Sequence, residues 1–109
     1  MTPDRELLEA AAKAAGVDGE YRTENLCPDG DWIDVTAIFF PDDQGWWDPL
    51  HDYGDALRLL ESKQMTLAFE PTRGGWSVGA ITKGAFCWLA HNDDAKRAIV
   101  CAAAAMVTS

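Results

Sequence analysis

The side chains that could do chemistry in this sequence are two histidines and three cysteines. His51 precedes Asp52, and His91 precedes a run of Asn and Asp, so either imidazole could act as a general base oriented by a carboxylate. No nucleophile and no second carboxylate is tied to either histidine by spacing, so we expect surface or capping roles. No pair among Cys27, Cys87 and Cys101 has the spacing of a zinc site. The sequence therefore predicts no enzyme activity, no cofactor and no metal site.

The cysteines also indicate a cellular compartment. They are odd in number and far apart, which suits a reducing cytoplasm better than a secreted disulfide framework. Charged residues interrupt the N-terminal stretch, and no apolar run approaches the roughly 18 residues that cross a bilayer, so neither a secretory signal nor membrane attachment is expected. Cys87 falls in an expected strand and Cys101 in an expected helix, and both are predicted to be buried.

The negative charge of the chain is concentrated in one region. The formal net charge is −9, and the segment from Asp18 to Asp55 holds eleven acidic residues against one basic residue, Arg22. That segment alone carries −10, and the remainder is nearly neutral. Such a surface repels nucleic acid phosphates and attracts a basic protein, so we expect a basic partner and no direct nucleic-acid binding.

Three interpretations of this acidic segment stay open. It could be a solvated surface that promotes solubility. It could face a basic protein groove that normally holds phosphates, as in a nuclease or a CRISPR effector, because duplex DNA carries about one charge per 1.7 Å. It could also hold a divalent cation through Asp29-Gly30-Asp31 or Asp42-Asp43, although the later glycine and glutamate of a calcium loop are missing.

Two adjacent tryptophans lie within this segment. Trp46 and Trp47 lie in a polar loop where both rings cannot easily point inward, and aromatic anchors are enriched at binding hot spots. The candidate protein-binding set is therefore Asp29, Asp31, Asp42, Asp43, Trp46, Trp47 and Asp48. An alternative set would stack a nucleotide base on the tryptophans and hold its phosphates with basic side chains: Trp46, Trp47, Arg58 and Arg73.

Hydrophobic periodicity predicts the elements that position these residues. A helix begins at Thr2-Pro3 and closes at Gly16, and a second helix follows Asp52 as its cap. Alternation predicts strands over residues 32–39, 65–69, 76–81 and 85–89, whereas residues 17–30 show no clear period. A last helix is capped by Asn92 or Asp93. The predicted order, α-β-α-β-β-β-α with an antiparallel meander, makes one α+β domain over residues 1–109, a layered sandwich.

The order of elements and three local motifs resemble the phage ABA-sandwich family, small proteins encoded by bacteriophages and prophages. The motifs are residues 4–16, 47–59 and 96–103, of which Trp47-Asp48-Pro49-Leu50-His51-Asp52-Tyr53 opens the most specific one. The resemblance implies α/β/α layering and a phage or prophage origin, hence a bacterial cytoplasm, and it implies no activity. We therefore expect a non-enzymatic accessory protein, an anti-CRISPR-like inhibitor or modulator of a host protein. The alternatives are a sponge for small nucleotides or signalling molecules and a structural or assembly role.

Overall fold

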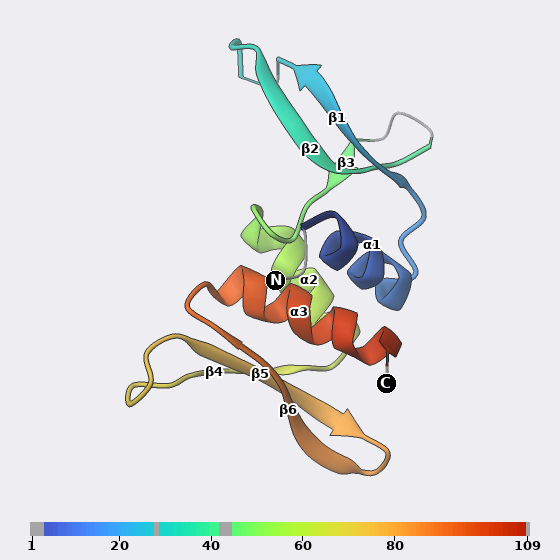
Figure 1. Cartoon of the computed structure of the whole chain (residues 1–109). Coiled ribbons are helices and arrows are strands. Elements are labelled where there is room, and N and C mark those ends of the chain that lie inside the picture. The colour runs from blue at the N-terminus through green and yellow to red at the C-terminus, as the bar shows by residue number, and fades with distance from the viewer. Residues whose placement is uncertain (1–3, 28, 42–44, 109) are drawn as a thin grey trace.

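The computed structural model describes residues 4–27, 29–41 and 45–108 and shows an α+β protein with three helices and two small antiparallel sheets. The elements in chain order are α1 (Asp4–Ala15), β1 (Glu20–Leu26), β2 (Ile33–Phe39), β3 (Trp46–Trp47), α2 (Tyr53–Ser62), β4 (Thr66–Phe69), β5 (Trp76–Thr82), β6 (Ala85–Asn92) and α3 (Ala95–Thr108). Strands β1–β3 form the N-terminal sheet and strands β4–β6 the C-terminal sheet. The helices lie between the two sheets (Figure 1).

The N-terminal sheet contains strands that the sequence did not predict. Residues 17–30 were expected to be irregular, yet β1 pairs with β2 along its whole length, from Glu20 opposite Phe39 to Leu26 opposite Ile33. Polar residues dominate β1, so it has no apolar face to bury. Its pairing with β2 holds it in the strand conformation instead. The observed order is α-β-β-β-α-β-β-β-α, and the predicted α-β-α-β-β-β-α is corrected to include β1 and β3.

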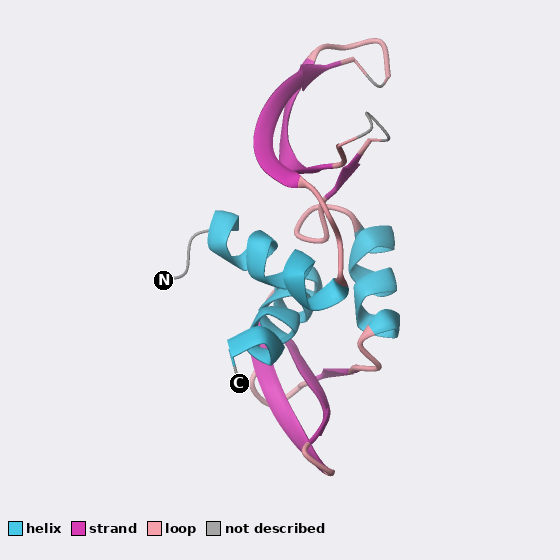
Figure 2. Ribbon diagram, turned by 90° about the vertical axis from the view of Figure 1, so that its right-hand side faces the viewer, coloured by secondary structure: helices cyan, strands magenta, loops and turns pink. Residues whose placement is uncertain are grey.

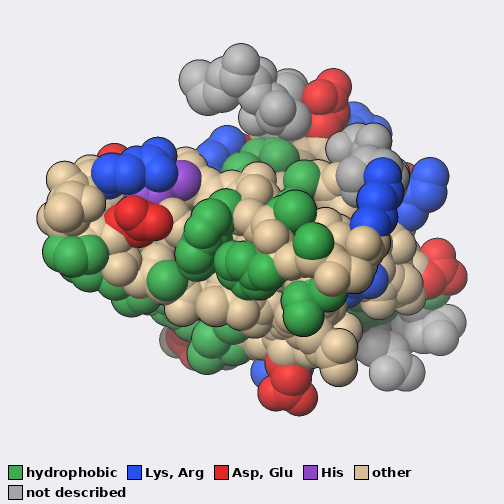
Figure 3. All heavy atoms as spheres, turned by 90° about the horizontal axis from the view of Figure 1, so that it is seen from below, with side chains coloured by type: hydrophobic (Ala, Val, Ile, Leu, Met, Phe, Trp, Pro, Cys, Tyr) green, Lys and Arg blue, Asp and Glu red, His purple; other side chains and the backbone are tan. Residues whose placement is uncertain are grey.

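The C-terminal sheet confirms the predicted meander. Strands β4, β5 and β6 are neighbours in that order and all pairs are antiparallel. One face packs its buried residues Val78 and Ala80 toward α3. The other face carries large exposed apolar side chains, Ile81, Phe86 and Trp88, and this face is seen from below in Figure 3. Its two aromatic rings meet edge to face with centroids 4.9 Å apart.

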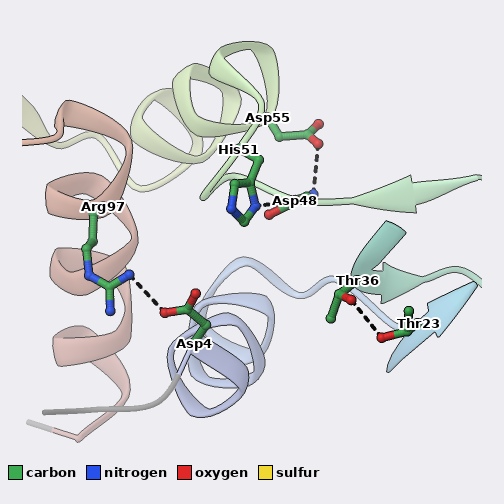
Figure 4. A network of polar contacts seen from close by, with 7 residues as sticks. All are labelled: Asp4, Thr23, Thr36, Asp48, His51, Asp55 and Arg97. Atoms are coloured by element: carbon green, nitrogen blue, oxygen red, sulfur yellow. Dashed lines mark hydrogen bonds and ion pairs between the residues drawn. The ribbon is translucent and has the colours of Figure 1, made fainter. Parts of the chain in front are cut away.

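Helices α1 and α3 supply most of the core. Both present small and aliphatic side chains to each other, so their backbones approach closely. Arg97 of α3 also donates to Asp4 Oδ1 of α1 at 2.9 Å (Figure 4). The buried residues of the two helices are Leu7, Leu8, Ala11, Ala12, Ala95, Ala98, Ile99, Val100, Ala102, Ala103 and Ala104. Within the described ranges, no helix combines the length and apolarity that a bilayer crossing requires.

The predicted cap of α2 is confirmed, whereas the cap of α3 differs from the prediction. Asp52 caps α2 as predicted, because its Oδ1 accepts the backbone N–H of Gly54 at 2.7 Å. At the start of α3 the carboxylate of Asp94, one residue beyond the predicted caps, accepts the N–H of Lys96 at 2.9 Å. Asn92 instead accepts the N–H of Asp94, which shapes the turn before the helix.

Replacing Leu8 by alanine tests the contact between α1 and α3. Leu8 is 1% exposed, so Leu8→Ala removes buried methyl groups and leaves a cavity. We expect a loss of about 2–5 kcal/mol in the free energy of unfolding, measured by urea titration. The control Leu57→Ala truncates a leucine that is 51% exposed on α2 and should cost less than about 0.5 kcal/mol. Equal losses for the two variants would contradict this packing.

Thiol reactivity tests where the cysteines lie. Cys27 and Cys87 are exposed, so the predicted burial of Cys87 is wrong: it lies near the hairpin turn at the start of β6, opposite Ala80. Burial raises the pKa of the Cys101 thiol, which lowers its thiolate fraction. With an aromatic disulfide reagent at about pH 8 we expect two fast thiols and one slow thiol. Only the slow phase should disappear in Cys101→Ser.

Candidate functional site

The acidic segment forms a groove of about 500 Å³ beside the N-terminal sheet. One wall is the first half of β2, and the other is the chain that leads from β3 into α2. The lining residues are Ile33, Asp34, Val35, Thr36, Trp46, Asp48, His51 and Asp52. Three of them are carboxylates and none is Lys or Arg, so the groove favours a cationic ligand.

The groove exists because β3 ends after two residues. Trp46 and Trp47 pair with Phe39 and Ile38, and the chain then leaves the sheet. The N–H of Asp48 donates to Asp55 Oδ2 at 2.9 Å, and Pro49 has no N–H to offer to a ladder. Among the described residues, no strand consequently lies beside residues 33–37 of β2 on this side, and the groove follows that edge.

Asp48 is the most constrained carboxylate in the groove. It is 6% exposed, although it lies in the wall. Its Oδ2 accepts from His51 Nδ1 at 2.8 Å, since an ionised carboxylate can only accept (Figure 4). Its Oδ1 is buried and has no hydrogen-bond partner among the described residues. A carboxylate oxygen buried in this way is destabilising unless a donor reaches it.

Two further carboxylates of the groove keep an oxygen for a ligand. Asp34 uses Oδ1 to accept from Asn25 Nδ2 at 2.9 Å, and Asp52 uses Oδ1 as the cap of α2. Their Oδ2 atoms make no hydrogen bond within the described part of the chain. Trp46 flanks these acids with a half-exposed ring, which can cover the face of a bound cation.

Asp55 holds the second wall of the groove in place. Its Oδ2 accepts the Asp48 N–H, and its Oδ1 accepts from Arg58 NH2 at 2.7 Å. The hydrogen bond and the charge of Asp55 together raise the pKa of the exposed Arg58 guanidinium. Arg58 is therefore a partner of Asp55 and lies outside the groove lining.

The structure separates the residues predicted to bind a protein partner. Trp46 and Asp48 lie in the groove, and Trp47 is buried in the core, 7% exposed. Asp29 and Asp31 are exposed in the turn between β1 and β2, which lies at the outer end of the sheet (Figure 2). The predicted residues at positions 42 and 43, Asp42 and Asp43, lie outside the described residues.

The alternative nucleotide site is not assembled as a unit. Trp46 and Trp47 belong to the N-terminal sheet, whereas Arg73 lies in the turn between β4 and β5 of the C-terminal sheet. Figure 1 shows the helices between these two places. Arg58 bonds to Asp55, so neither arginine adds positive charge to the groove.

Six residues of the groove lining are absent from the predicted binding sets: Ile33, Asp34, Val35, Thr36, His51 and Asp52. Asp34 and Asp52 counted among the acids of the acidic segment, but Asp34 and Thr36 were otherwise assigned to polar positions of a strand, and Asp52 to a helix cap. The spacing of Asp48 and His51, three residues apart, was the one available signal, because it allows a bond across a single turn. Within the described ranges, no group of three or more His, Cys, Asp or Glu side chains is arranged to hold a metal ion.

No protein-family model, curated protein or solved structure matches this chain. The resemblance to the phage ABA-sandwich family accordingly stays a prediction.

Replacing Asp55 tests its role in shaping the groove. Asp55→Ala leaves the buried N–H of Asp48 without an acceptor, which should lower the free energy of unfolding by about 1–3 kcal/mol in urea titrations. The control Arg58→Gln removes the ion pair and keeps the carboxylate that accepts this N–H, so it should lose clearly less stability. If Arg58→Gln were as destabilising as Asp55→Ala, the ion pair with Arg58, and not the hydrogen bond from the Asp48 N–H, would account for the stability that Asp55 contributes.

Proposed function

We propose that this chain is a non-enzymatic binding protein whose acidic groove receives a cationic side chain of a basic partner protein. The observation that carries the proposal is Asp48, a buried groove carboxylate whose Oδ1 has no partner among the described residues. In the resulting picture the protein is a phage or prophage accessory protein in the cytoplasm of a bacterial host. It inhibits or modulates a host protein there, such as a defence effector.

A guanidinium group fits the chemistry of the groove best. It is planar, always charged and offers five N–H donors, so one group can donate to more than one acceptor among the groove carboxylates of Asp34, Asp48 and Asp52. It also stacks on aromatic faces, and Trp46 supplies one. A phosphate-bearing nucleotide would instead meet three carboxylates and no Lys or Arg in the lining. The geometry therefore favours a basic protein over the nucleotide sponge.

Charge and the resemblance support the kind of partner that we propose. Proteins that hold nucleic acid expose arginines in grooves, and an acidic protein can occupy such a groove. Asp29 and Asp31, exposed at the outer turn, would extend the acidic surface beyond the groove. The phage origin and the α/β/α sandwich are part of this proposal and rest on the motifs that resemble the phage ABA-sandwich family.

Neutralising the groove tests the proposed function. The double variant Asp34→Asn, Asp48→Asn removes two groove charges, so it should capture fewer basic proteins from a bacterial host lysate, identified by mass spectrometry. Capture by the wild type should weaken between about 0.05 and 0.5 M salt, because screening acts on charge pairing. The control Glu61→Gln, Asp93→Asn changes the net charge equally at exposed sites outside the groove and should capture like the wild type.

A second comparison assigns the role of the outer acids. The variant with asparagine at positions 29, 31, 42 and 43 keeps the groove acids and removes the turn acids. A larger loss of capture in this variant than in the groove variant would move the binding surface from the groove to the turns. Unchanged capture in both variants would refute binding through the acidic segment altogether.

A further inference from the structure

The groove follows the edge of a strand, and four consecutive residues of β2 show this. Residues 33, 34, 35 and 36 all line it. Successive side chains of a strand point to opposite faces, so a groove on one face would take only every second residue. A groove that takes every residue lies along the edge, where the backbone is within reach. No strand of the described part of the chain pairs with the β2 edge there, because β3 reaches only to Ile38.

The backbone groups that face this edge can be assigned. The N–H of Phe40 donates to Gly45 O at 3.2 Å, toward the β3 side. In an antiparallel sheet the N–H and C=O of every second residue point the same way, so Ile38, Thr36 and Asp34 also point toward that side. Thr36 and Asp34 thus direct two N–H and two C=O groups into the groove.

The contacts with β1 agree with this assignment. Residue pairs without backbone hydrogen bonds bring their side chains closest together. Thr36 Oγ1 lies 2.6 Å from Thr23 Oγ1, and Asp34 accepts from Asn25 at 2.9 Å, each across the strand pair (Figure 4 shows the threonines). Both pairs therefore leave the backbone groups of Thr36 and Asp34 directed away from β1.

We propose that the groove binds an extended basic segment of the partner as an added antiparallel strand along β2, in line with β3. The inference rests on the proposed function and names its mode of recognition. Backbone hydrogen bonds to Thr36 and Asp34 hold the segment, and alternate side chains follow one face of the sheet. An arginine opposite Asp34 lies within reach of its carboxylate, and the far wall offers Asp48 and Asp52.

Charge selects a basic segment over a second copy of this chain. Pairing two β2 edges would bring together two segments that each carry −10. Charged side chains at strand edges suppress such self-pairing, and Asp34 occupies that position on β2. The same carboxylates attract a strand with arginines. The edge therefore repels a second copy of this chain and favours a basic segment.

Peptide binding measured by fluorescence anisotropy tests the strand. The probe is a labelled seven-residue peptide of alternating threonine and arginine, and two further peptides carry N-methyl groups on one or the other alternate set of backbone nitrogens. All three have the same side chains and charge. We expect one N-methylated set to weaken binding at least about tenfold and the other to leave it unchanged, because only alternate N–H groups face β2.

Two substitutions in the chain give a matched comparison. Thr36→Pro removes the N–H that faces the groove, and proline is tolerated at strand edges. Thr36→Val removes the same hydroxyl and keeps the N–H. We expect Thr36→Pro to weaken the unmodified peptide at least about tenfold and Thr36→Val to bind like the wild type. If Thr36→Pro fails to fold by circular dichroism, the N-methylated peptides decide the question with the wild-type chain.

The outcomes separate this inference from the proposed function. Equal binding of all three peptides, or no binding of the unmodified peptide at about 1 mM, overturns strand addition. If lysate capture still depends on Asp34 and Asp48, the cation-binding groove survives that result. A dimer of the free chain that Thr36→Pro dissolves would place a second copy on the edge and would also overturn the inference.

Discussion

The hydrogen bond from the Asp48 N–H to the Asp55 carboxylate is the contact on which the arrangement around the groove depends. It takes the chain out of the sheet after Trp47 and fixes the start of α2 against β3. The same carboxylate accepts from Arg58, so one buried side chain of α2 joins its own helix to the loop that follows β3. Together with Pro49, which has no N–H for a ladder, this bond ends β3 and leaves the edge of β2 that lines the groove accessible.

Much of the fold could be predicted from local patterns. Strand β2 shows alternation, α2 has an aspartate at its cap, and the meander has turns with glycine. Strand β1 could not be predicted, because its polar residues acquire order only from cross-strand partners such as Thr36 and Asp34. The sequence predicted that the two tryptophan rings would not both point inward. Adjacent strand residues face opposite ways, so Trp47 enters the core and Trp46 stays at the surface.

The candidate site was less accessible from sequence than the fold. Its carboxylates come from β2, from the end of β3 and from the cap of α2, and only the pairing register brings them together. The acidic segment predicted a binding surface. The groove is the part of that surface where carboxylates and accessible backbone groups of β2 lie together. Composition showed the sign of the charge, whereas the place at which β3 ends decides which charges act together.

The N-terminal sheet extends away from the helices, and this placement couples recognition to local order (Figure 2). Residues 37–39 of β2 are buried, whereas no residue of β1 is, so the outer half of the hairpin owes its stability to cross-strand pairs alone. Such a unit opens at a smaller free energy than the helical core. A ligand that binds only the closed hairpin therefore adds its binding free energy to the cohesion of that unit. Ligand affinity and the rigidity of this hairpin therefore both depend on the same equilibrium between its open and closed forms.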